Sequence, residues 1–187
     1  KIIDVNFNEI NGGSAEVIVA KSASKEKPNF KKINKILKEE ELINEKSYEK
    51  FNLRLENVKK VINHFLDNTK KKVFGYGAST KGNIILNHCR INSKKIKYIA
   101  DGNSQKWGRF TPGSNIKIIP KNEMRKKKPD YLFVLIWSFR SEVIKQEKKF
   151  ILKGGKLILP LPIFHIIDKE NYKYYLNHDL NSFRYNI

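Results

Sequence analysis

The sequence has 187 residues, 40% of them hydrophobic, with a formal net charge of +19 and a single cysteine, Cys89. The length fits one main domain with an appended element, the composition excludes a disordered chain, and one cysteine excludes an internal disulfide and a multi-cysteine zinc site. The charge would suit nucleic acid, but only six of the 38 basic residues are Arg, so we expect a solvated lysine surface that also attracts small anions. A basic nucleic-acid-binding protein is kept as an alternative function. We expect no membrane span and a reducing, cytoplasmic setting.

Residues 1–29 are predicted to form a β-hairpin followed by a linker. Apolar residues alternate at Ile3, Val5 and Phe7, a glycine-rich turn follows at residues 11–13, and a second apolar run covers residues 17–20. The polar stretch that comes next is typical of a linker. We interpret this piece as left over from the junction with a catalytic domain.

Residues 30–70 are predicted to form a helical lead-in of two helices. The first ends near Asn44, and Ser47 is the expected N-cap of the second. His64 is expected to be a packed histidine on the apolar face of that second helix. This face is marked by residues at helical spacing, namely Phe51, Leu55, Val58, Ile62 and Phe65.

Residues 71–187 are predicted to form the main domain, because short apolar runs alternate there with helical stretches. Such alternation implies a parallel sheet with right-handed crossovers. The fold class is therefore α/β: a Rossmann-like parallel sheet flanked by helices, preceded by a β-hairpin and a long helical segment. The five expected strands cover residues 73–76, 96–100, 116–119, 131–136 and 156–159.

The first of these strands runs into a glycine-punctuated turn and then a helix. Glycines let the backbone turn sharply, and the N–H groups and positive dipole end at the start of a helix favour a bound phosphate. We therefore predict an anion site here, with a tight turn that binds no ligand as the alternative. Lys81 would add a positive charge, and Ser79 or Thr80 a hydroxyl donor. The residues assigned to this site are Gly75, Gly77, Ala78, Ser79, Thr80, Lys81 and Gly82.

A dinucleotide fingerprint is matched only in part. Thr80 stands where the third glycine belongs, and glycine follows two residues later at Gly82. Asp101, at the end of the second strand, occupies the approximate place of a ribose-binding acid. A stand-alone nucleotide-binding or NAD-binding module is therefore the alternative function.

A second group of candidate residues lies in loops that follow strands. Residues 101–113 form a long polar loop at a strand's carboxyl end, where open α/β sheets bind ligands. Lys106 and Arg109 would bind a diphosphate there, unless Arg109 forms a structural ion pair. Trp137 would stack on a base or a sugar, with core packing as the alternative. No catalytic residue and no metal site is predicted, since His88 and His165 have no metal-like spacing.

Six strings in the main domain form one combined pattern: residues 74–83, 87–89, 99–103, 106–113, 128–131 and 154–156. Upstream of them stand three consecutive glutamates at residues 39–41, Tyr48 and Phe51. Together these strings resemble the C-terminal domain of the sugar C-methyltransferase family, which depends on S-adenosylmethionine. Asn11 stands where the family's His-Gly-Gly-Ser turn has His.

The resemblance implies an enzyme of three parts: a zinc domain, a central S-adenosylmethionine domain and this C-terminal Rossmann-like domain. The family methylates a ring carbon beside the ketone of a nucleoside-diphosphate keto-sugar, through an enolate. By this resemblance the chain would bind the nucleoside-diphosphate sugar and pack against a missing S-adenosylmethionine domain. Methyl transfer is not expected from this chain alone, and S-adenosylmethionine is expected only in the full-length enzyme.

Overall fold

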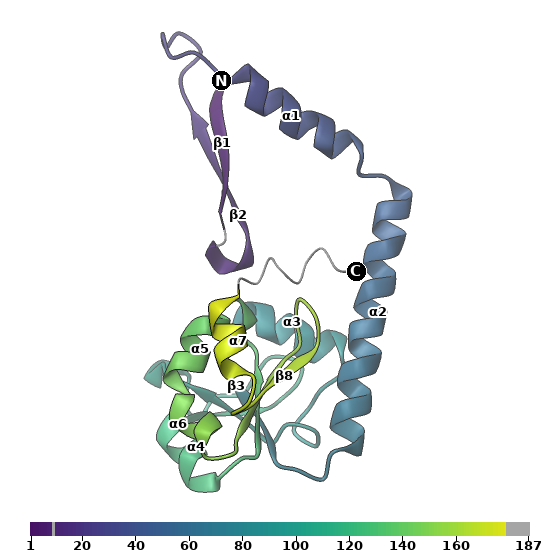
Figure 1. The fold of residues 1–187 in the computed structure, drawn as a ribbon, viewed down its shortest axis with the longest axis vertical. Coiled ribbons are helices and arrows are strands. Elements are labelled where there is room, and N and C mark those ends of the chain that lie inside the picture. The colour runs from purple at the N-terminus through teal and green to yellow at the C-terminus, as the bar shows by residue number, and fades with distance from the viewer. Residues whose placement is uncertain (9, 179–187) are drawn as a thin grey trace. The chain divides into compact units, whose positions relative to one another are not determined.

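The structure is a computed structural model that describes residues 1–8 and 10–178. The chain forms two compact units, Lys1–Leu55 and Glu56–Ile187, called unit 1 and unit 2 below. One long helix, α2 (Glu45–Asn68), begins in unit 1 and ends in unit 2 (Figure 1). The division of the sequence at residues 29 and 70 stays a prediction.

Unit 1 starts with the predicted hairpin. Strand β1 (Ile2–Asn8) pairs antiparallel with β2 (Ser14–Val19), and the short 3₁₀ helix η1 (Ile10–Gly12) lies at the turn. Helix α1 (Phe30–Glu41) follows and is tied to the hairpin by the Lys32 ammonium, which lies 3.2 Å from the Asp4 carboxylate. The hairpin is confirmed.

Helix α2 begins three residues earlier than an N-cap at Ser47 would allow. The Asn44 side chain accepts a hydrogen bond from the Ser47 N–H, and the Ser47 hydroxyl accepts one from the Asn44 N–H, both at 3.3 Å. This reciprocal pair is a capping box in which Ser47 is the third helical residue. The predicted N-cap was therefore wrong.

Unit 1 has no core of its own in the part of the chain that the structure describes. The buried apolar residues begin at Ile62, in unit 2. An isolated two-stranded hairpin and a helix of this length are each marginal in water. Unit 1 therefore needs further contacts to be stable. Its exposed apolar side chains include Phe7, Val17, Val19, Phe30, Leu37, Leu42, Ile43, Phe51 and Leu53.

Unit 2 contains a six-stranded sheet in the order β5-β4-β3-β6-β7-β8. Five strands run parallel and the last pairs antiparallel with its neighbour. Counted within unit 2, this order is the Rossmann order 3-2-1-4-5-6, so the predicted fold class is confirmed. The strands are β3 (Val73–Tyr76), β4 (Tyr98–Asp101), β5 (Lys117–Pro120), β6 (Tyr131–Val134), β7 (Lys156–Leu159) and β8 (His165–Ile167).

Strand β8 was not expected from the sequence, which placed His165 beyond the last strand. His165 is instead the first residue of β8 and pairs with Leu159. The strand is only three residues long and follows a proline-containing turn, so it has too few residues to show a period of two. A short antiparallel strand at the edge of an otherwise parallel sheet is a common arrangement.

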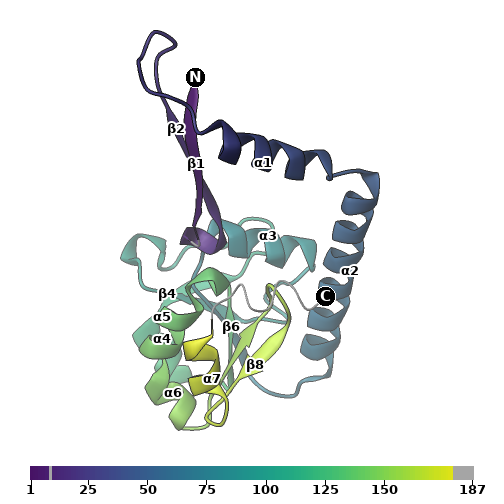
Figure 2. The ribbon, with the colours of Figure 1, turned by 45° about the horizontal axis from the view of Figure 1, so that its top comes forward.

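Helices cover both faces of the sheet and bury two apolar clusters (Figures 1 and 2). One face carries α4 (Lys121–Lys127), α5 (Arg140–Gln146), α6 (Lys148–Leu152) and α7 (Tyr172–Asn177). The other carries α3 (Thr80–His88) and the C-terminal half of α2, through Ile62 and Leu66. His64 is exposed, because it lies about 200° around the helix from Ile62. The expectation of a packed histidine was wrong.

Helix α3 lies very close to the sheet at Gly82. A Cβ at this position would meet the Leu135 Cβ at 2.5 Å and the Leu135 carbonyl oxygen at 3.0 Å. A side chain there would push α3 away from the strand that it crosses. Gly82 therefore serves the close helix–strand packing that the third glycine of a Rossmann turn provides.

We expect Gly82→Ala to lower the free energy of unfolding by about 1 to 2 kcal/mol, because overpacking outweighs the gain in helix propensity. Gly102→Ala is the matched control, since its Cβ would meet only the Lys121 side chain at 3.9 Å. This control should change stability by no more than about 0.5 kcal/mol. Urea denaturation measures both variants, and equal stabilities would contradict the packing role.

Candidate functional site

The candidate site lies where the parallel strands of unit 2 end. Strands β3, β4 and β6 run in the same direction, so Tyr76, Asp101 and Val134 end at one edge, called the carboxyl edge below. The strand order reverses between β3 and β6, which makes this the topological switch point where open α/β sheets bind ligands. The glycine loop, the long loop after Asp101 and the segment after β6 all leave the sheet here.

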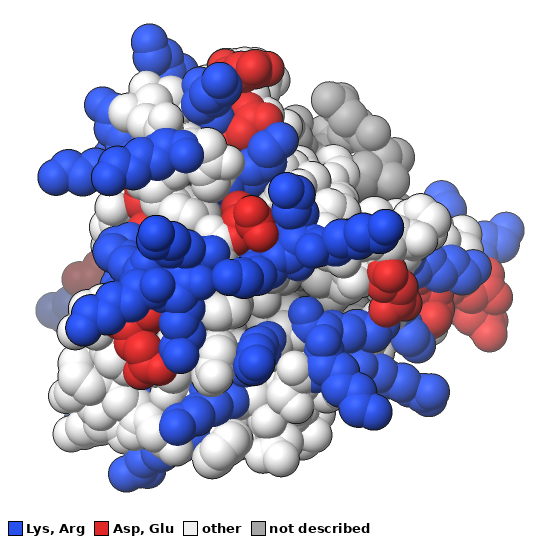
Figure 3. Space-filling model, turned by 90° about the horizontal axis from the view of Figure 1, so that it is seen from below, with Lys and Arg blue, Asp and Glu red and all other residues white. Residues whose placement is uncertain are grey.

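The positive charge of the chain is concentrated in unit 2. Unit 1 has 11 basic and 9 acidic residues, a net of +2, whereas the remaining residues have 27 basic and 10 acidic, a net of +17. Many of the lysines precede strands and so lie at the opposite, amino edge of the sheet. Figure 3 shows Lys and Arg side chains crowding this lower face, with few acidic side chains between them. Exposed examples are Lys70, Lys71, Lys72, Lys94, Lys97, Lys126, Lys128 and Lys153.

At the carboxyl edge, Asp101 joins the glycine loop to the long loop. Its carboxylate, only 8% exposed, accepts hydrogen bonds from the Ala78 N–H at 2.7 Å and the Asn103 N–H at 2.8 Å. The Lys106 ammonium donates to the Ala78 carbonyl oxygen at 2.8 Å and lies 3.5 Å from the same carboxylate. Asp101 thus binds the protein itself rather than presenting both oxygens to a ribose, which disfavours the NAD alternative.

Ser79 caps helix α3. Its hydroxyl oxygen accepts from the Gly82 N–H at 2.9 Å and its proton is donated to the Leu135 carbonyl oxygen at 3.1 Å. The side chain therefore joins the start of α3 to the end of β6. Of the two hydroxyls predicted as ligand donors, only that of Thr80 lies exposed at the first position of the helix.

The glycines of the loop make room for protein side chains. A Cβ at Gly75 would lie 2.6 Å from the Ile99 side chain. At Gly77, where φ is +83°, a Cβ would lie 2.7 to 2.9 Å from three carbons of Ile136. Ile136 thus fills the space that a bound diphosphate takes beside this glycine in dinucleotide-binding folds.

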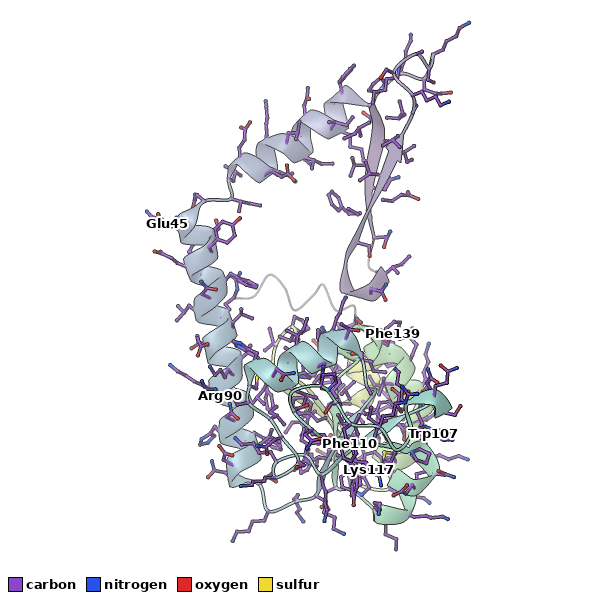
Figure 4. The ribbon with its side chains drawn as sticks, turned by 180° about the vertical axis from the view of Figure 1, so that it is seen from behind. Glu45, Arg90, Trp107, Phe110, Lys117 and Phe139 are labelled. Carbon is purple, nitrogen blue, oxygen red and sulfur yellow. The ribbon has the colours of Figure 1, made fainter. Side chains whose placement is uncertain are left out.

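The long loop folds back as a hydrogen-bonded arm. The Gly108 N–H donates to the Ile118 carbonyl at 2.9 Å, and the Ile118 N–H donates to the Arg109 carbonyl at 2.8 Å. Phe110 forms an antiparallel bridge with Lys117, the first residue of β5. Figure 4 labels both residues, which lie close together. The Arg109 side chain is exposed and forms no ion pair with a carboxylate of the described residues, so the expected alternative of a structural ion pair is absent there.

The two tryptophans of the edge have different surroundings. Trp137, in the 3₁₀ helix η3 (Trp137–Phe139), is half-buried and packs against both apolar clusters, which are the contacts of a core aromatic. Trp107 follows the 3₁₀ helix η2 (Ser104–Lys106), is 43% exposed and donates its indole N–H to the Asp101 carbonyl at 2.9 Å. Trp107 therefore holds the start of the loop.

Sequence reasoning missed a buried polar network under the carboxyl edge. Tyr76 donates to the Glu147 carboxylate at 2.9 Å, and Arg125 binds the same carboxylate through two hydrogen bonds of 2.8 and 3.0 Å. Lys121 donates to the Tyr76 hydroxyl oxygen at 2.6 Å and to the Gln146 side-chain oxygen at 3.0 Å. The one local signal of this network in the sequence was the position of Tyr76 between two glycines. The other residues lie 45 to 71 positions away from it.

Burial and the contacts with Glu147 shift the pKa values in this network. Desolvation, together with the negative charge of Glu147, raises the pKa of Tyr76 well above its usual value, so its hydroxyl stays protonated. The hydrogen bonds to Glu147 raise the pKa of Arg125. On the opposite face of the sheet, burial raises the pKa of the Cys89 thiol to about 11.

Two kinds of feature are absent from the residues that the structure describes. No cluster of three or more His, Cys, Asp or Glu side chains is placed to hold a metal ion. Among residues 1–8 and 10–178, no helix combines the length and the apolar character needed to cross a membrane.

Comparison with known proteins decides the family. Residues 9–162 match the C-methyltransferase C-terminal domain. The chain belongs to this family. This C-methyltransferase C-terminal domain is similar to the C-methyltransferase NovU of Streptomyces niveus. The two sequences are 31% identical over 177 residues, and the alignment covers 91% of the chain. The chain spans 42% of the length of that relative.

The described residues of this C-methyltransferase C-terminal domain do not fit S-adenosylmethionine, the usual methyl donor of such enzymes. Asp101, which stands where a ribose-binding acid belongs, has both carboxylate oxygens bound to the protein. Ile136 fills the space beside Gly77. The carboxyl edge instead presents separate cationic and hydroxyl groups, which suit an anionic ligand lying on the surface of the loops.

We expect Asp101→Ala to lower the free energy of unfolding by about 2 to 3 kcal/mol, because it removes the acceptor of the Ala78 N–H. Asp67→Ala is the control: this carboxylate pairs with Lys95, but its side chain is 55% exposed. An exposed pair contributes at most about 1 kcal/mol. Urea denaturation compares the two, and a loss at Asp101 no larger than that at Asp67 would show that the Asp101 contacts do not hold the loops.

Proposed function

We propose that this domain binds the nucleoside-diphosphate sugar for a C-methyltransferase that uses S-adenosylmethionine and acts on a keto-sugar. The observation that carries the proposal is the family match, which includes the whole carboxyl edge of the sheet. The edge lies at the switch point of a Rossmann-ordered sheet, where such folds bind nucleotides. The net charge of +17 in the second unit favours an anionic ligand.

Within the proposed site, the residues divide into two groups. Thr80 and Lys81 at the start of α3, together with Arg109 on the arm, would contact the diphosphate, Arg109 through its planar pair of donors. The other predicted residues would keep the loops in the shape that presents these donors. They are Gly75, Gly77, Ala78, Ser79, Gly82, Asp101, Lys106 and Trp137.

The methyl donor and the general base would come from the rest of the enzyme. The lack of fit to S-adenosylmethionine supports this, as does the lack of a buried core in the described part of unit 1. The apolar side chains of the hairpin and α1 would pack against the methyl-donor domain. In this proposal the 187 residues bind and orient the substrate but do not transfer a methyl group by themselves.

We expect deoxythymidine diphosphate to raise the melting temperature of the chain, because a ligand that binds only the native state stabilises it by mass action. Lys81→Ala and Arg109→Ala should each weaken binding about tenfold, the value of one charge-assisted contact. Lys94→Ala, an exposed residue at the amino edge, is the matched control and should bind as the wild type does. Thermal shift and calorimetric titration measure these effects.

Two outcomes would count against the proposal. If Lys81→Ala and Arg109→Ala both bind the diphosphate with unchanged affinity, these residues do not contact it as assigned. Stronger stabilisation by NAD than by a nucleoside-diphosphate sugar would favour a stand-alone dinucleotide-binding module instead.

A further inference from the structure

Lys121 is a cation at the carboxyl edge that lies outside the set of residues assigned to the proposed site. It is the first residue of α4 and follows Pro120, the register partner of Asp101 in the neighbouring strand. Its Cε lies 3.9 Å from the position that a Cβ of Gly102 would take, and no other atom outside residues 101–103 comes within 4 Å of that position. Lys121 thus borders an open surface beside the residue that follows Asp101.

The Lys121 side chain is held in place by neutral groups. Its ammonium donates to the Tyr76 hydroxyl oxygen and the Gln146 side-chain oxygen, and it lies 4.7 Å from the centre of the Tyr76 ring. An ammonium has three N–H donors, so these two contacts leave one donor. The raised pKa of Tyr76 keeps that residue a neutral phenol rather than a phenolate that would cancel the lysine charge.

The nearby carboxylates are already neutralised by other cations. Arg125 binds Glu147 through two hydrogen bonds, and Lys106 lies 3.5 Å from Asp101. Lys121 forms no ion pair with a carboxylate of residues 1–8 or 10–178. Its charge is therefore uncompensated within the described structure, although its position is fixed at the ligand-binding edge.

We propose that Lys121 is a further anion-binding residue of the site, besides Thr80, Lys81 and Arg109, and contacts a phosphoryl oxygen of the bound nucleotide from the β5 side of Asp101. This inference rests on the proposed function and extends the site from the start of α3 across the ends of β4 and β5. Tyr76 and Gln146 act as positioning residues, because they hold the ammonium without neutralising it. A fixed, uncompensated cation binds an anion more favourably than a mobile surface lysine does, since less side-chain entropy is lost.

The test is calorimetric titration of the 187-residue chain with deoxythymidine diphosphate and, separately, with uncharged deoxythymidine. Lys121→Met should lower the affinity for the diphosphate about tenfold and leave the affinity for deoxythymidine unchanged, because only the diphosphate has the anionic oxygens. Lys121→Arg keeps the charge and should bind the diphosphate within about threefold of wild type. Lys94→Met removes the same charge from the amino edge and is the matched control.

The outcomes separate this inference from the function on which it rests. One outcome is that the wild type binds the diphosphate, Lys81→Ala lowers the affinity for it and Lys121→Met does not. In that case the role of Lys121 is overturned and the proposed function stands. Another outcome is that Lys121→Arg loses as much affinity for the diphosphate as Lys121→Met and that the urea midpoint falls equally in both variants. The role of Lys121 would then be structural. Absence of diphosphate binding by wild type would overturn both.

Discussion

The hydrogen bonds of the Asp101 carboxylate are the constraint on which the carboxyl edge depends. One oxygen holds the N–H of Ala78 in the glycine loop, and the other holds the N–H of Asn103 at the start of the long loop. Lys106 adds a second connection to Ala78 and offsets the charge of the acid. Asp101 therefore ties the glycine loop to the long loop.

The same constraint separates this domain from a dinucleotide-binding fold with the same strand order. In such folds the acid after the second strand binds a ribose and the glycine turn approaches a diphosphate. Here the acid binds the protein, and the space beside Gly77 is taken by Ile136. The order of the strands is shared, but the ligand would have to lie further out, on Thr80, Lys81 and Arg109. A fold-level likeness alone therefore does not decide which residues contact a ligand.

Sequence reasoning predicted most of the fold because its signals are local. Runs of β-branched and aromatic residues between helical stretches indicated the parallel sheet, and a glycine-rich turn indicated the hairpin. It failed at His165, since β8 is too short to show a pattern, and at Ser47, where the capping box reverses the roles of two polar residues. His64 was assigned to the apolar face of α2, although it lies about 200° around the helix from Ile62.

The site was only partly predictable for a related reason. Glycines mark a turn in the sequence, but whether they make room for a ligand or for a side chain depends on residues such as Ile136 and Leu135, more than 50 positions away. The network of Tyr76, Lys121 and Glu147 likewise joins three separate segments. Residues brought together only by the folded sheet leave no spacing that a sequence pattern could show.

The most direct measurement of the central claim is a titration of isotope-labelled chain with deoxythymidine diphosphate, followed by backbone amide NMR shifts. The account predicts saturable shifts at the start of α3, at Arg109 and at Lys121, with the amides of the lysine-rich amino edge unmoved. Shifts confined to the amino edge around Lys71 and Lys94, and lost as salt is raised, would contradict it, because the ligand would then bind the general charge of the protein and not the site.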